Sequence, residues 1–194
     1  MKSTKGTLST LLVYLLPFFS IVITSAVASE MLPANFVPPA PGTVIVWKGV
    51  KNGEKFNEEH LVGKNSGLLA RWKSGGKNLE RYGLITFGPP KTFDTSSVDP
   101  LWPLKVGNSV SYSRKKGNRK WNDSIKVLGT ETITVGAGTF DTFVLLFKSK
   151  RDNNKWYGQF KAWYAPNVGW AVKREYSDSE RKSMKSEVIE IRSP

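Results

Sequence analysis

The stretch QFKAWYAPNVGWAVKREY, Gln159 to Tyr176, predicts a β-hairpin. On each side of a central Pro166-Asn167 pair, apolar and polar residues alternate with the period of two that half-buried strands show. Proline has the φ angle required at the first central position of a tight turn, and asparagine tolerates the second. We therefore interpret the aromatic residues around this pair as part of a structural turn, with an aromatic platform for a sugar or lipid as the alternative.

The same alternation continues over most of the chain from Thr43 onward, between turn signals such as Asn52-Gly53 and Gly117-Asn118. No window of helical length carries an apolar stripe with a 3.6-residue period. Short strands joined by hairpins must close or stack to cover their apolar faces. The sequence therefore predicts an all-β fold, an antiparallel meander of about 8–11 strands forming a barrel, half-barrel or sandwich.

Three segments refine this expectation. Phe140 to Phe147 is apolar on both faces, which is typical of a central strand covered on both sides or facing a cavity. Trp121 to Leu128 and Thr130 to Val135 are each expected to form a strand. Gly88 to Pro103 is the longest gap between strands and is rich in turn formers, so we expect a surface excursion or a lid there.

The N-terminus has the organisation of a secretory signal. Lys2 and Lys5 precede an uncharged run that ends in Ala26-Val27-Ala28, so residues 1–28 are expected to be a signal peptide. An uncleaved anchor is the alternative, because the run approaches the roughly 20 residues that span a bilayer. Residues 29–42 form a proline-rich lead-in, and residues 43–194 are expected to form a single β domain. The interpretation is an exported monomer, periplasmic or extracellular, without a stable membrane span after cleavage.

The chain has no cysteine, which excludes disulfides, thiolate chemistry and a lipidated cysteine. The predicted mature chain keeps 27 basic and 16 acidic side chains, because the signal contains two lysines and no acid. Such a surface attracts anionic polymers and lipid headgroups, and export disfavours nucleic acid as a partner. Four basic residues at one predicted hairpin tip are candidates for this contact: Lys115, Lys116, Arg119 and Lys120. A solvated tip that protects a strand edge is the alternative.

Two motifs resemble those of an uncharacterised exported bacterial β-rich family, known as a domain of unknown function. Val135 to Phe147, VGAGTFDTFVLLF, is similar to its "aGTFdt" strand entry, and Lys161 to Glu175, KAWYAPNVGWAVKRE, to its "WYaPxvG" hairpin. Leu104 to Ser113 resembles its "lkvGxxwxY" strand. The resemblance implies an exported β fold with no established catalytic residue or cofactor. Nearby members look like curved β half-barrels that carry lipids or lipoproteins, which is an analogy of fold only.

The sequence contains few candidates for catalytic chemistry. His60 is the only histidine, and Glu58 and Glu59 alternate along a predicted strand, so their carboxylates point to opposite faces. Asp94 and Asp99 lie in the long gap and could serve a hydrolase, although both are also common turn residues. No motif for a nucleophile, a phosphate-binding loop or a metal site is present. We therefore expect a non-enzyme without a cofactor, and keep a hydrolase using the loop carboxylates as an alternative.

The leading hypothesis is an exported β protein that binds a lipid-like ligand or an envelope component. A β-barrel interior can be filled by side chains or can hold one small ligand. The residues expected to line an apolar cavity are Phe143, Leu145, Phe147, Phe160 and Trp170, and a filled core is the alternative. The second hypothesis is a basic surface-binding module for anionic polymers or headgroups.

Overall fold

The computed structural model describes residues 31–82, 89–152 and 156–194, and the predicted signal peptide lies outside these ranges. The described strands form one antiparallel sheet in the order β4-β3-β2-β1-β10-β9-β8-β7-β6-β5. Their bounds are β1 Val44–Lys51, β2 Glu54–Val62, β3 Leu69–Ser74, β4 Lys77–Tyr82, β5 Ser109–Lys116, β6 Arg119–Val135, β7 Gly138–Arg151, β8 Tyr157–Ala165, β9 Trp170–Asp178 and β10 Ser183–Arg192. The all-β prediction is confirmed.

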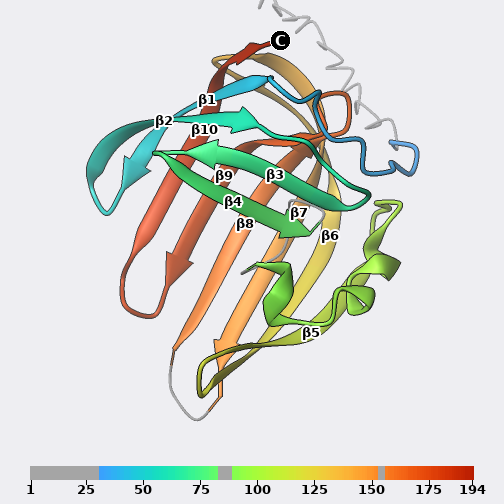
Figure 1. Cartoon of the computed structure of the whole chain (residues 1–194), viewed down its shortest axis with the longest axis vertical. Helices are drawn as coiled ribbons and strands as arrows, with labels where there is room; N and C mark the ends of the chain where they lie inside the picture. The colour runs from blue at the N-terminus through green and yellow to red at the C-terminus, as the bar shows by residue number, and fades with distance from the viewer. Residues whose placement is uncertain (1–30, 83–88, 153–155) are drawn as a thin grey trace, which may run out of the picture.

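The sheet consists of two meanders, β1 to β4 and β5 to β10, which are joined by antiparallel pairing of β1 with β10. Figure 1 shows β6 to β9 side by side, with β1 to β4 turned across one end of these strands. β4 and β5 are the two outer strands and do not pair with each other. The sheet is therefore curled and open, as in the half-barrel that was one of the expected forms.

β6 is longer than expected. The segments Trp121 to Leu128 and Thr130 to Val135 belong to one 17-residue strand, Arg119–Val135. The register with β7 shifts between Val127 and Gly129, which is the signature of a β-bulge. Because a bulge interrupts the alternation of side chains, the sequence pattern there resembles two separate strands.

The apolar side chains form two clusters, and β7 supplies both. Phe143, Leu145 and Phe147 pack in the first cluster, whereas Val144 packs in the second with Trp163 and Trp170. All of these side chains are buried, which confirms that the β7 segment is covered on both faces.

The segment between β4 and β5 packs into the first cluster. Its three short 3-10 helices are η1 Pro90–Thr92, η2 Thr95–Ser97 and η3 Asp99–Leu101. Val98, Leu101 and Leu104 are fully buried. Polar residues of the segment, such as Lys91 and Asp94, are exposed, so the segment lies at the surface as expected, while its apolar residues fill the interior beneath it.

The lead-in is fixed against the same region. Ala34 and Leu104 exchange two backbone hydrogen bonds, at 3.0 and 2.8 Å, and the rings of Phe36 and Trp102 lie 5.4 Å apart. The Pro166-Asn167 turn connects β8 to β9 as predicted, and the amide of Gly169 donates to the carbonyl of Ala165 at 2.9 Å. Trp163, Tyr164 and Trp170, the aromatic residues beside this turn, are buried in the two clusters.

Candidate binding surfaces

The residues expected to line an apolar cavity do not form one group. Phe143, Leu145 and Phe147 are buried in the first cluster, and Phe160 packs against them, with its ring 5.3 Å from that of Phe147. Trp170 lies in the second cluster. The first cluster also contains apolar side chains of the segment between β4 and β5, which therefore occupy space in front of these strands.

The basic residues predicted at a hairpin tip lie at the turn between β5 and β6. Lys115, Arg119 and Lys120 are exposed, and Lys116 pairs with Arg119 along the ladder. The neighbouring Arg114 is held at the base of this hairpin. Its Nε lies 2.6 Å from the buried Asp123 carboxylate, and its guanidinium stacks 4.5 Å from the ring of Trp121.

A second concentration of positive charge was not predicted. A groove of about 1000 Å³ runs along the β3–β4 hairpin, the loop before it and η1. We call it the basic groove. Its charged lining residues are Lys64, Arg71, Lys73, Arg81 and Lys91, with Glu80 as the single acid among them. The positive excess favours an anionic occupant.

Local hydrogen bonds fix both the backbone and the guanidinium of Arg71 in this groove. The Arg71 amide donates to Asn65 Oδ1 at 2.9 Å, and Arg71 Nη1 donates to the carbonyl of Lys64 at 3.2 Å. Arg71 and Lys73 are two residues apart on β3, so they share one face of the hairpin. The only acid in the lining, Glu80, lies 3.9 Å from Arg71 Nε, a weak contact between exposed groups.

Arg81 also lines the groove, but it pairs with Ala70 and therefore lies on the hairpin face opposite to Arg71. Burial lowers the pKa of its guanidinium, and the like charge of Arg114 lowers it further. Its Nη1 donates to the backbone carbonyl of Glu80 at 2.7 Å. A cation that has lost hydration in this way gains more from an anion than a fully solvated one does.

An internal polar network lies behind the groove. His60 is buried and its Nε2 lies 3.1 Å from Glu58 Oε1, while its ring stacks on Trp72 at 5.6 Å. Arg174 Nη2 is 3.9 Å from Glu58 Oε2, and its guanidinium lies 3.6 Å from the ring centre of Trp47. Trp72 also contributes to the lining of the basic groove, but it alternates with Arg71 and Lys73 along β3, so the network packs on the opposite face of the hairpin from these two side chains.

The pKa shifts in this network have identifiable causes. The hydrogen bond from His60 lowers the pKa of Glu58 to about 2, against an opposing effect of burial. Burial lowers the pKa of His60, and burial also lowers the pKa of Arg174 to about 10. A neutral histidine inside an aromatic cluster is a packing residue that orients its carboxylate partner. Glu59 points the other way, as predicted, and pairs with Arg192 at 2.6 Å.

The loop carboxylates have structural partners. Asp94 caps η2 by accepting from the Ser96 amide at 3.1 Å, and Asp99 accepts a hydrogen bond from the Tyr82 hydroxyl. Within residues 31–82, 89–152 and 156–194, no three His, Asp or Glu side chains cluster as metal ligands would. Nor does this part of the chain contain a helix that is both long and apolar enough to cross a membrane.

The molecule is thus an open, curled antiparallel sheet with a packed interior and a strongly basic exterior. Residues 108–189 match the model of the DUF3108-like family, a segment that begins just before β5 and ends within β10. This match agrees with the predicted resemblance to a domain family of unknown function. A search of curated proteins finds no match.

Three solved structures are similar to the chain at low identity. A candidate exported protein with a YmcC-like fold from Bacteroides fragilis is 14% identical, with 82% of this chain and 100% of that chain covered and a TM-score of 0.44. A candidate lipoprotein from Parabacteroides distasonis is 15% identical, with 84% and 100% covered and a TM-score of 0.44. The hypothetical lipoprotein YmcC from Escherichia coli is 12% identical, with 80% and 90% covered and a TM-score of 0.49.

Proposed function

We propose that the protein is an exported, non-enzymatic binding protein that holds a phosphate-bearing component of the cell envelope in the basic groove. The observation that supports this proposal is the charge of the groove. Its lining contains five cationic residues and one carboxylate, and Arg71 and Lys73 share one face of the β3–β4 hairpin. Export is supported by the order of basic, apolar and small residues in the first 28 positions.

The groove is a better place for a ligand than the interior. A lipid-like ligand inside the sheet would have to displace Val98, Leu101 and Leu104, which pack against Phe143 and Leu145. Displacing these side chains from a packed interior would lose the favourable contacts that they make there. The basic groove is already open to solvent, and an anion entering it displaces no apolar side chain.

The groove is also a better candidate than the hairpin tip. Lys115, Arg119 and Lys120 project from a turn, where solvent surrounds each ammonium or guanidinium group and screens it. Most cations of the groove are exposed as well, but they line a cavity of about 1000 Å³, in which Arg71 and Lys73 share one hairpin face and can act on the same phosphate group.

Two triple variants of equal charge change distinguish these sites. The groove variant carries Lys64→Gln, Arg71→Gln and Lys73→Gln, and the matched control carries Lys115→Gln, Arg119→Gln and Lys120→Gln. The purified protein is mixed with vesicles of phosphatidylcholine containing phosphatidylglycerol, with pure phosphatidylcholine vesicles, and with soluble polyphosphate. Each basic residue near an anionic surface contributes about 1 kcal/mol, so the groove variant should bind at least about tenfold more weakly.

The expected result is binding that weakens with salt and is lost in the groove variant but retained in the control. Binding to vesicles alone would identify a lipid headgroup, and binding to polyphosphate as well would identify the phosphate group itself. Loss of binding in the hairpin-tip control alone would move the site to that tip and contradict the proposal. Absence of binding to both anionic probes would also contradict it.

A further inference from the structure

The outer face of β5 to β8 carries a second groove, of about 920 Å³, that differs in chemistry from the basic groove. The registers of these strands place two rows of its lining residues side by side on one face. One row is Ser113, Asn122, Lys150 and Tyr157, and the other is Ser111, Ser124, Lys148 and Gln159. Phe147 and Phe160, which belong to the apolar interior, alternate with these residues and point to the opposite face.

Differences in side-chain length explain the depth of this outer groove. The lining residues of β5 and β6 include the short Ser111, Ser113 and Ser124, whereas the longer Lys148, Lys150 and Tyr157 extend from β7 and β8. Asp94, from the segment that precedes β5, lies at the β5 edge of this groove, because its neighbour Phe93 forms an isolated β-bridge with Arg114 of β5. The result is a trough across four strands that is open along its length.

The chemistry of the trough favours a neutral, hydroxyl-rich ligand. Asn122 accepts from Ser113 Oγ at 3.0 Å and donates to Asp152 at 2.8 Å, and Gln159 donates to Ser177 Oγ at 3.3 Å. Each amide nitrogen has a second hydrogen to donate, and serine hydroxyls can donate and accept, so the lining keeps hydrogen-bonding capacity for a ligand. The exposed charged groups of the lining are Lys148, Lys150 and Asp94, so the positive excess is far smaller than in the basic groove. A protein partner would require an apolar centre, which these two rows do not provide.

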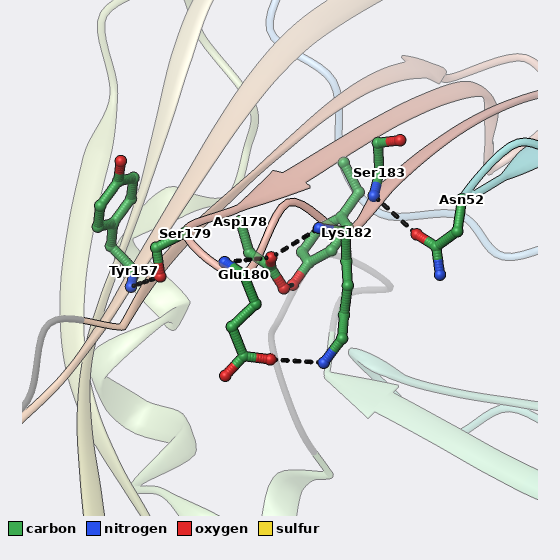
Figure 2. A network of polar contacts seen from close by, with 8 residues as sticks. Asn52, Tyr157, Asp178, Ser179, Glu180, Lys182 and Ser183 are labelled. Atoms are coloured by element: carbon green, nitrogen blue, oxygen red, sulfur yellow. Dashed lines mark hydrogen bonds and ion pairs between the residues drawn. The ribbon is translucent and has the colours of Figure 1, made fainter.

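Tyr157 adds an aromatic surface at the rim. Tyr157 is 62% exposed, a large exposure for a tyrosine next to a groove. Two hydrogen bonds to Ser179 fix the backbone of Tyr157: its amide donates to Ser179 Oγ at 3.1 Å, and its carbonyl accepts from the Ser179 amide at 2.9 Å. Figure 2 shows the ring pointing away from Ser179 and from the Asp178 turn, so these contacts fix the backbone without covering the ring.

We infer that this outer groove binds a neutral oligosaccharide, with Tyr157 stacking on a sugar ring and the serine and amide groups bonding to its hydroxyls. A flat aromatic face combined with a few placed polar groups is the arrangement that recognises an amphipathic ring ligand. The inference is independent of the proposed phosphate-binding function, because the two grooves share no lining residue.

The test uses the protein purified after expression of the full chain, with maltohexaose, cellohexaose and chitohexaose as probes in saturation-transfer NMR and calorimetric titration. Tyr157→Ala removes the stacking ring, and Ser124→Phe fills the floor of the groove. Leu128→Ala is the control, since Leu128 is an exposed residue of β6 outside the groove. At least one hexasaccharide is expected to bind the unmodified protein. Its affinity should fall about fivefold or more in Tyr157→Ala and be lost in Ser124→Phe, and Leu128→Ala should bind normally.

Failure of all three hexasaccharides to bind at millimolar concentration would overturn the inference. So would a hexasaccharide affinity that Tyr157→Ala leaves unchanged, because that exposed substitution is not expected to disturb folding. Vesicle and polyphosphate binding should be unaffected in Tyr157→Ala and in Ser124→Phe, which separates this result from the test of the basic groove.

Discussion

Replacing Gly169 by alanine should destabilise the fold for two reasons: it strains the β8–β9 turn, and it creates a clash with the lead-in that lies over this turn. Gly169 has a φ of +68°, a conformation in which a side chain is strained. A Cβ atom at this position would also lie 1.8 Å from the carbonyl oxygen of Val37. Nonbonded carbon and oxygen atoms stay about 3.3 Å apart, so the lead-in would have to move by about 1.5 Å.

The expected loss of stability has two parts. The positive φ costs about 1–2 kcal/mol for a residue with a Cβ. Overpacking against the lead-in adds about 1–3 kcal/mol. Gly75 provides a matched control, because its φ is +52° and nothing lies within 4 Å of a Cβ placed there. Gly169→Ala should therefore lose about 2–5 kcal/mol, and Gly75→Ala about 1–2 kcal/mol.

Urea denaturation followed by tryptophan fluorescence measures both losses in terms of the free energy of unfolding. Limited proteolysis provides a second measurement, because a displaced lead-in should be cut between Ala34 and Gly42 in Gly169→Ala and not in Gly75→Ala. Equal losses in the two variants would refute the reasoning, since they would mean that the contact with Val37 contributes nothing.

Three further predictions concern the interior, the hydrogen bond of Tyr82 and the polar network around His60. Phe143→Ala should lose about 3–5 kcal/mol of unfolding free energy in the same denaturation assay, because its ring is fully buried. The control Leu128→Ala replaces an exposed residue and should change this free energy by no more than about 0.5 kcal/mol. Similar losses in the two variants would argue against a packed core. Tyr82→Phe should lose about 1 kcal/mol of unfolding free energy, because it removes the hydrogen bond to Asp99 that links β4 to η3. An unchanged denaturation midpoint would show that this bond does not contribute to stability. Because the folded-state pKa values of His60 and Glu58 both lie below their ordinary values of 6.5 and 4.5, the unfolded chain binds more protons, so stability should fall as the pH drops from 6.5 towards 2. Glu58→Gln should flatten the lower part of this dependence, between pH 4.5 and 2, and an unchanged slope there would contradict the assignment.

The sequence was sufficient to predict the fold class because the strands alternate and the turns contain specific residues. The hairpin around Pro166-Asn167 and the doubly covered β7 segment are both present as predicted. The bulge between Val127 and Gly129 was not predictable, because it breaks the alternation from which strands are recognised. Pairing of β1 with β10 was equally hidden, since contacts between distant strands leave no local pattern.

The candidate sites were harder to predict. The spacing of Arg71 and Lys73 on one strand face was visible in the sequence, but Lys64 and Lys91 join them only through the folding of two separate loops. The hairpin-tip lysines form a visible pattern because they are adjacent in sequence. The packing of Val98 and Leu101 into the interior depends on tertiary contacts, which the turn-rich sequence of their segment does not indicate.

Mapping of an anion titration onto the backbone amides tests the central claim most directly. Tripolyphosphate is added to the ¹⁵N-labelled protein, and amide shifts are followed at low and high salt. We predict saturable shifts concentrated between Lys64 and Arg81, including the Arg71 amide, that diminish as the salt concentration rises. Shifts confined to Lys115 to Lys120, or no saturable shifts at any site, would contradict the assignment of the basic groove as the binding site.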